Sequence, residues 1–106
     1  MSSYGAASSL NPSAKDNTLA SIRLEFFGVA RRRANVAAIT LDVACLREVL
    51  LQIGEQFPPL AQLCVEDGEL APGWLLNVNG SAFTRDLRSP LNDGDSVLLI
   101  PADAGG

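Results

Sequence analysis

Four consecutive apolar residues close to the C-terminus restrict the possible folds of this chain more than any other feature. Residues 96–101 read Ser-Val-Leu-Leu-Ile-Pro, and a strand here would be apolar on both faces, because successive side chains of a strand point to opposite sides. A run of this kind normally belongs to a strand that is buried on both faces. One substantial helix is indicated, by apolar residues that recur at helical spacing: Leu46, Val49, Leu50, Ile53 and Phe57. One helix covers one face of a sheet, so the other face should keep an exposed apolar patch, which usually marks an interaction site.

The neighbouring strands suggest which residues form this patch. They repeat the pattern of adjacent apolar side chains, and we predict that Phe27, Leu75 and either Leu98 or Ile100 contribute. The alternative is that residues 60–73 fold over the second face and cover it.

Alternating apolar residues predict the strands, and clusters of Gly, Pro, Asn and Asp predict the turns between them. The expected strands are residues 22–27, 36–41, 74–78, a short irregular one anchored by Phe83 and Leu87, and 96–101. Residues 29–35, which hold three consecutive arginines, are expected to form a hairpin loop. Asp42 is expected to cap the helix, which should end at Pro58-Pro59 before a short second helical turn.

This order of elements predicts the fold class. One main helix must cover one mixed sheet of four to five strands, and a two-layer α+β domain is the natural solution. We expect three parts: a flexible N-terminal tail over residues 1–20, a folded domain over 21–101, and a flexible C-terminal tail over 102–106.

Composition excludes several functions. The chain has 106 residues, which allows one domain and no deep active-site cavity. Its net charge of −4 argues against general binding to nucleic acid or to an anionic membrane, and no apolar run is long enough to span a bilayer. There is no histidine, so the usual general base and commonest metal ligand are missing. The N-terminus does not look like a secretory signal, and a cytoplasmic location is expected.

The sequence ends in Gly105-Gly106, an ending that arises by chance in roughly 0.5% of sequences, since about 7% of residues are glycine. Two residues without side chains can pass through a narrow channel and present only the terminal carboxylate. We therefore expect the tail to act inside a partner protein. The structural alternative is a frayed, unused end.

Two segments carry a resemblance to a known family. The first segment is the opening Ile22-Arg23-Leu24-Glu25-Phe26-Phe27-Gly28. The second runs from Pro90 through Asn92-Asp93-Gly94-Asp95 and the last strand to Gly-Gly. Both resemble the family of the ubiquitin-like β-grasp sulfur carriers. The opening looks most like the small subunit of molybdopterin synthase. Residues 74–79, the Asp-Gly-Asp turn and the Ala-Gly-Gly end also resemble the carrier that donates sulfur for cysteine synthesis. The serine-rich segment before residue 21 fits neither pattern.

The resemblance implies a β-grasp fold and a reactive carbon on Gly106. A partner of the E1-like adenylating class would consume ATP to activate that carboxylate, which would then become a thiocarboxylate. This chain would bind no cofactor, which agrees with its lack of a phosphate-binding Gly-x-x-x-x-Gly-Lys motif. The large catalytic subunit of a synthase complex would accept the tail. The residues expected to bind partners are Phe27, Leu75, Leu98, Ile100, Pro101, Ala102, Asp103 and Ala104, with Gly105 and Gly106 at the reactive end.

Alternatives remain at each level. The same class includes carriers for cysteine or thiamin synthesis, a different class includes ubiquitin-like modifiers joined to target proteins through Gly106, and a plain binding module with an inert tail is a third possibility. The three arginines could steer an acidic partner or engage phosphate, although a solvated loop tip is the simpler interpretation. Cys45 and Cys64 are interpreted as small buried hydrophobic residues rather than as a thioester or disulfide pair. Asp103 could pair with a basic residue of the activating enzyme or stay solvated.

Overall fold

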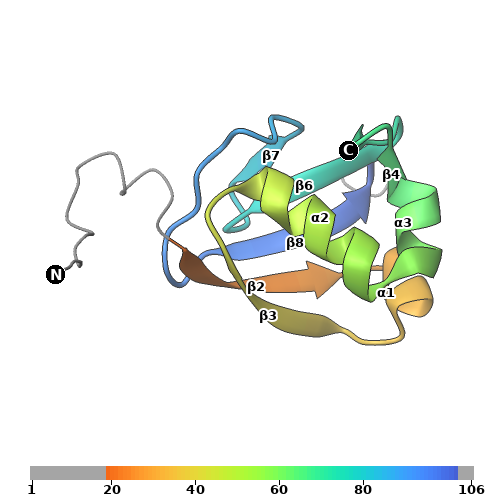
Figure 1. Cartoon of the computed structure of the whole chain (residues 1–106), viewed down its shortest axis with the longest axis horizontal. Coiled ribbons are helices and arrows are strands. Elements are labelled where there is room, and N and C mark those ends of the chain that lie inside the picture. Colours follow the sequence, from red (N-terminus) through yellow and green to blue (C-terminus); the bar gives the residue numbers. More distant parts are fainter. Residues whose placement is uncertain (1–18, 103–106) are drawn as a thin grey trace, which may run out of the picture.

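The computed structural model describes residues 19–102, in which one layer of helices lies against one face of a five-stranded sheet (Figure 1). The strands of this sheet are β2 (Ala20–Phe26), β3 (Ala38–Val43), β6 (Trp74–Val78), β7 (Ala82–Thr84) and β8 (Ser96–Pro101). The helices are α1 (Val29–Ala34), α2 (Leu46–Gln56) and α3 (Pro58–Cys64), and β4 (Val65–Glu66) pairs with β5 (Glu69–Leu70) in a small hairpin.

The first and last strands of the described part lie side by side in the middle of the sheet. The strand order is β3-β2-β8-β6-β7, with β2 and β8 parallel and every other pair antiparallel. In the parallel pair Phe26 lies opposite Leu99, so both strands end at the same edge of the sheet. This mixed five-stranded sheet with α2 packed across it confirms the predicted fold class.

The core lies between the sheet and the helices. Alternate residues of the central strands point toward α2, among them Leu24, Leu76 and Leu99, each with an exposed fraction of 0%. Phe57 at the end of α2 packs edge-to-face on Phe26, with ring centroids 5.3 Å apart.

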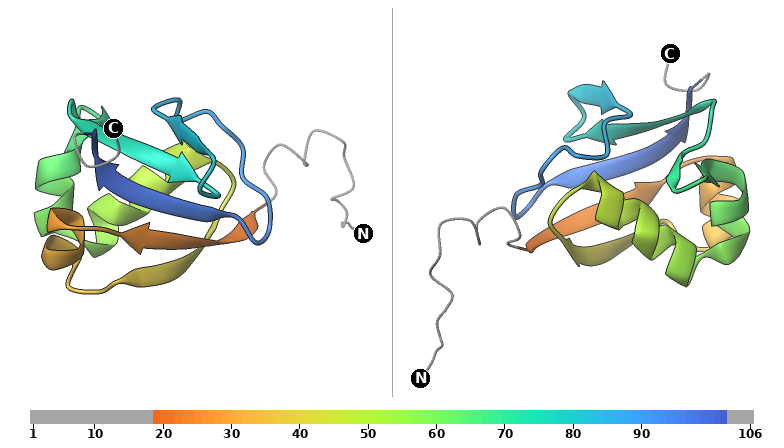
Figure 2. Two further views of the ribbon diagram at one scale, coloured as in Figure 1. Left: turned by 180° about the vertical axis from the view of Figure 1, so that it is seen from behind. Right: turned by 45° about the horizontal axis from the view of Figure 1, so that its top comes forward.

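The segment after α2 packs on this same side of the sheet. Leu60, Cys64 and Leu70 are buried members of the single core cluster. The alternative that residues 60–73 fold over the second face is therefore wrong. Viewed from behind, in the left panel of Figure 2, that face of the sheet has no helix in front of it.

The structure corrects the expected hairpin loop at residues 29–35. This segment is a helix, α1, because Ala30 and Ala34 lie one turn apart and are both buried against the core. Gly28 makes the turn into it with φ 60° and ψ −128°, a conformation open to glycine, and Asn35 ends it in the left-handed region. With this helix in place, the following strand starts at Ala38, two residues later than expected.

Two further local predictions were wrong. Asp42 does not cap α2: it lies within β3, and Cys45 occupies the N-cap position without a side-chain cap. Glu48 in the first turn instead accepts a hydrogen bond from the Ala44 N–H at 2.7 Å. Leu87 lies beyond β7, although it is buried. By contrast, Pro58 ends one helix and starts the next, as expected.

The turn before β8 ties three strands together. The Asp93 carboxylate accepts a hydrogen bond from the Ser21 N–H at 2.7 Å, where β2 begins. Asp95 accepts one from the Asn79 side-chain amide at 3.0 Å, and Asn79 in turn accepts one from the Ser96 N–H at 2.8 Å. These contacts fix the start of the last strand.

Candidate functional site: the tail exit and the open sheet face

The last strand leaves the sheet at a defined point. Pro101 pairs with Trp74 at the end of β8, and the Ala102 N–H donates a hydrogen bond to the Gly73 carbonyl at 2.7 Å. Gly73 has φ 87°, a backbone conformation that favours glycine. We call Gly73, Trp74, Pro101 and Ala102 the tail exit, because the chain continues from here toward Gly106.

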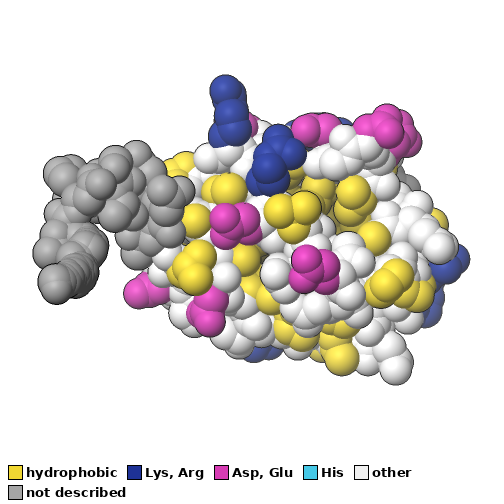
Figure 3. All heavy atoms as spheres, in the orientation of Figure 1, with side chains coloured by type: hydrophobic (Ala, Val, Ile, Leu, Met, Phe, Trp, Pro, Cys, Tyr) yellow, Lys and Arg dark blue, Asp and Glu magenta, His cyan; other side chains and the backbone are white. Residues whose placement is uncertain are grey.

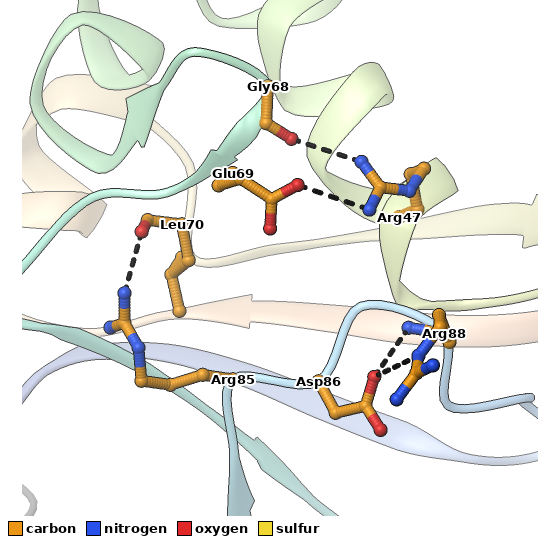
Figure 4. A network of polar contacts seen from close by, with 7 residues as sticks. All are labelled: Arg47, Gly68, Glu69, Leu70, Arg85, Asp86 and Arg88. Carbon is orange, nitrogen blue, oxygen red and sulfur yellow. Dashed lines mark hydrogen bonds and ion pairs between the residues drawn. The ribbon is translucent and has the colours of Figure 1, made fainter.

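Arg85 holds the loop that forms one side of the tail exit. Its guanidinium donates hydrogen bonds to the carbonyls of Leu70 at 2.7 Å, Trp74 at 2.5 Å and Ala71 at 3.4 Å. Figure 4 shows this side chain reaching across from the segment after β7 to the Leu70 carbonyl. One planar group with five donors suits this task, because it can serve several acceptors in fixed directions. The loop around Gly73 is thereby fastened to β7.

Two exposed ion pairs lie near this loop (Figure 4). Arg47 of α2 meets Glu69 at 3.2 Å and also donates to the Gly68 carbonyl at 3.3 Å. Arg88 meets Asp86 at 3.1 Å. Hydrogen bonds from the Arg88 side chain and backbone lower the pKa of the Asp86 carboxyl below its usual value.

The uncovered face of the sheet carries part of the predicted patch. Phe27, directly after β2, is 53% exposed, and Leu75 and Leu98 are half-buried. Of the two alternatives, Leu98 and Ile100, the structure favours Leu98, since Ile100 is only 7% exposed. It lies between Leu75, its partner on β6, and the end of β2, so its neighbours cover it.

Phe83 is a member of this face that we did not predict. It is 51% exposed and lies opposite Asn77 of β6. The sequence marked it only as an anchor of a short strand. The face is therefore apolar at two exposed phenylalanines with a half-buried strip between them, and its β2 side carries the Arg23–Glu25 ion pair at 2.8 Å.

The two cysteines lie in different environments. Both are free, and Cys64 is buried in the core, which confirms its interpretation as a small hydrophobic residue. Burial raises the pKa of its thiol to about 11. Cys45 is half-buried. Within residues 19–102 no group of three or more Cys, Asp or Glu side chains is arranged to hold a metal ion.

Four predicted site residues, Asp103, Ala104, Gly105 and Gly106, lie outside the described residues. The structure brings the other expected tail residues, Pro101 and Ala102, to the edge where β2 also ends. None of the helices in the described part is both long enough and apolar enough to cross a membrane.

Comparison with known proteins shows similarity in structure. No protein-family model matches the chain, and no curated protein sequence matches it. Small archaeal modifier protein 1 from Methanosarcina acetivorans superposes with a TM-score of 0.70 at 23% identity, over 83% of this chain and 98% of that one. A proposed molybdopterin converting factor subunit 1 from Pyrococcus furiosus gives 0.62 at 18%, over 77% and 97%.

A chain of the BexX/CysO complex from Amycolatopsis orientalis gives a TM-score of 0.67 at 19% identity, over 80% of this chain and 99% of that one. These three similarities extend over nearly the whole length of each neighbour. At such identities they establish the fold. The chain therefore has the ubiquitin-like β-grasp fold.

Proposed function

We propose that this chain is a sulfur carrier whose Gly106 carboxylate is activated and converted to a thiocarboxylate. The observation that carries the proposal is the tail exit: β8 is clamped in the middle of the sheet, and Ala102 is bonded to Gly73. The four residues that follow can extend at most about 14 Å, at roughly 3.5 Å per residue. A partner that takes this tail must therefore dock against the domain around the exit.

The proposed chemistry takes place in the active site of the partner. A Gly106 carboxylate oxygen attacks the α-phosphorus of ATP, the bond to pyrophosphate breaks, and an acyl-adenylate forms. Hydrosulfide then attacks the acyl carbon, and AMP leaves with the bonding electron pair and the former carboxylate oxygen. The product is a thiocarboxylate, which can transfer its sulfur to an acceptor. We place this reaction in the cytoplasm.

We further propose molybdopterin synthesis as the pathway, with the large subunit of the synthase as the acceptor of the tail. Support comes from the opening segment of residues 22–28 and from the fold shared with the Pyrococcus furiosus protein. Carriers for cysteine or thiamin synthesis are the alternatives in the same class. The shared fold with a chain of the BexX/CysO complex keeps the first of these open.

A second candidate function is protein modification through Gly106. It is favoured by the fold shared with small archaeal modifier protein 1, which is named as a modifier. Both functions require the same adenylate, and they differ in what attacks it. A lysine amine of a target protein would give a stable amide, whereas hydrosulfide gives the thiocarboxylate.

The test is intact mass spectrometry of the full chain after incubation with an E1-like adenylating enzyme, ATP and sulfide. We expect the mass to rise by the difference between one sulfur and one oxygen atom, and to stay unchanged in a variant that lacks Gly106. Omission of ATP is the second control. Amide adducts on other proteins without the sulfur shift would favour the modifier. A chain that gains neither sulfur nor AMP with any such enzyme of its source organism would refute both functions and leave a binding module.

A further inference from the structure

The helix α1 presents the one group of basic side chains that is not neutralised within residues 19–102. Arg31, Arg32 and Arg33 are consecutive and exposed, and none lies within ion-pair distance of a carboxylate in that part of the chain. The surroundings explain this, because neither residues 26–37 nor α3 contains an acidic residue. Figure 3 shows basic side chains at the right-hand edge of the molecule, where Figure 1 places α1.

The other described arginines are already engaged. Those at positions 23, 47 and 88 each pair with a carboxylate, and Arg85 binds backbone carbonyls. The three arginines of α1 therefore add three positive charges at one place in a chain whose net charge is −4, so the remaining residues carry −7. A molecule with this distribution has a strong charge asymmetry.

The positive end of this asymmetry lies at the same end of the sheet as the tail exit. β2 and β8 run parallel, and Phe26 lies opposite Leu99, so α1 after β2 and the tail after β8 leave the same edge of the sheet. The exposed ring of Phe27 lies between the end of β2 and α1. A partner that receives the tail within about 14 Å of Ala102 therefore also approaches α1.

We propose that Arg31, Arg32 and Arg33 form, with Phe27, a docking surface for an acidic protein surface that surrounds the tail channel of the adenylating partner. This proposal rests on the proposed function for the identity of the partner. Opposite charges raise the rate of encounter and orient the molecule before contact, and the orientation here brings the tail end of the molecule toward the partner first. The rest of the chain, which carries −7, is repelled by the same acidic surface.

The test compares two variants of equal net charge. R31Q/R32Q/R33Q removes the proposed surface, and the matched control R23Q/R47Q/R88Q removes three positive charges from ion pairs elsewhere. Association rate constants with the purified adenylating enzyme are measured at low ionic strength and at about 0.5 M salt, where surface charges are largely screened. We expect the α1 variant to associate about 10-fold more slowly at low salt and to lose most of the salt dependence. The control should keep both, and equal losses in the two variants would overturn the proposal.

The gain of sulfur tests the proposed function, and the association rate tests the docking surface, so the two proposals can fail separately. At saturating enzyme the α1 variant should still gain sulfur, because its tail is intact. If the wild-type chain gains sulfur but its association rate equals that of the α1 variant, the surface is wrong and the function stands. If no adenylating enzyme acts on the chain, an oligoglutamate peptide serves as the probe in a nuclear magnetic resonance titration.

In that titration the amides of α1 and Phe27 should shift in the wild-type chain and in the control variant, and should not shift in the α1 variant. If the amides of this region do not shift, the proposed docking surface is wrong. That result does not bear on the sulfur chemistry. Binding of an oligonucleotide or of anionic vesicles at α1, with oligoglutamate inert, would also overturn it in favour of a different partner.

Discussion

Replacing Arg85 by methionine should loosen the tail exit in a measurable way. Methionine keeps much of the length and apolar stem of arginine but has no hydrogen-bond donor. The substitution leaves the carbonyls of Leu70, Ala71 and Trp74 without the guanidinium that now serves all three. Gly73 lies between the last two of these residues, and its carbonyl holds the Ala102 N–H. A loop that moves more freely should therefore hold Ala102 less well.

The size of the effect follows from these contacts. A hydrogen bond from a charged donor contributes roughly 1.5–3 kcal/mol when its partner is buried. The three bonds share one guanidinium, one of them is long at 3.4 Å, and Arg85 is exposed overall, so water can replace part of the loss. We expect a loss of about 1–2 kcal/mol in the free energy of unfolding. For a domain of this size that corresponds to a fall in Tm of roughly 5–15 °C.

The assay that separates loop fastening from general stability is hydrogen exchange at single amides. In Arg85→Met the Ala102 amide should exchange faster relative to amides of the central strands, such as that of Leu99, than it does in the wild-type chain. The control is Arg88→Met, which removes an exposed ion pair and should leave the stability nearly unchanged. Equal acceleration of exchange at Ala102 and Leu99 would show that Arg85 stabilises the whole domain and does not fasten the exit, and unchanged exchange at both would refute the role altogether.

Three further predictions concern single residues. Phe27→Ser should weaken partner binding by at least 10-fold while changing the free energy of unfolding by less than about 0.5 kcal/mol, because the ring is 53% exposed. Calorimetry measures the binding and thermal unfolding measures the stability. A large loss of stability would contradict the exposed position of the ring. The pKa of the Asp86 carboxyl lies below its usual value. Its stabilising contribution is therefore present above the unfolded pKa of 3.8 and is lost as pH falls through the folded pKa. Arg88→Gln should raise the pKa of Asp86 in a carboxyl titration, and an unchanged pKa would refute the pairing. Cys64, with a pKa of about 11, should resist alkylation in the native protein at pH 8 and react after unfolding. Its neutral form favours folding fully below pH 9.0, and this contribution is lost as pH rises toward 11, so rapid native labelling would contradict its burial.

The strongly periodic elements could be predicted from the sequence. α2 is predicted because several apolar residues repeat at helical spacing and each repeat adds to the same signal, and β8 because four consecutive residues are apolar. The uncovered face followed from counting faces against helices, and it is present. Its composition was predicted less well, because the burial of Ile100 depends on the side chains beside it in the sheet.

The sequence predictions were wrong or missing where an element is too short to show a periodic pattern, or where a side chain binds backbone carbonyls. α1 has six residues and only two buried apolar side chains, and its three arginines look like a solvated loop tip. Arg85 gave no signal at all, since its acceptors are carbonyls 11 to 15 residues away along the chain. Any residue type supplies a carbonyl, so such a contact leaves no trace in the amino-acid pattern.

The short reach of the tail decides where partner specificity must lie. With about 14 Å between Ala102 and the last residue at most, an enzyme cannot bind Gly106 and leave the domain untouched. Because β2 and β8 end at one edge, Phe27 and the start of α1 lie at the same end of the sheet as the tail exit. Two glycines carry almost no information by which a partner is chosen, since they lack side chains. Under the proposed function, discrimination between an activating enzyme and an acceptor subunit is therefore expected to come from the domain surface at this edge, where a basic and an aromatic contact are both available.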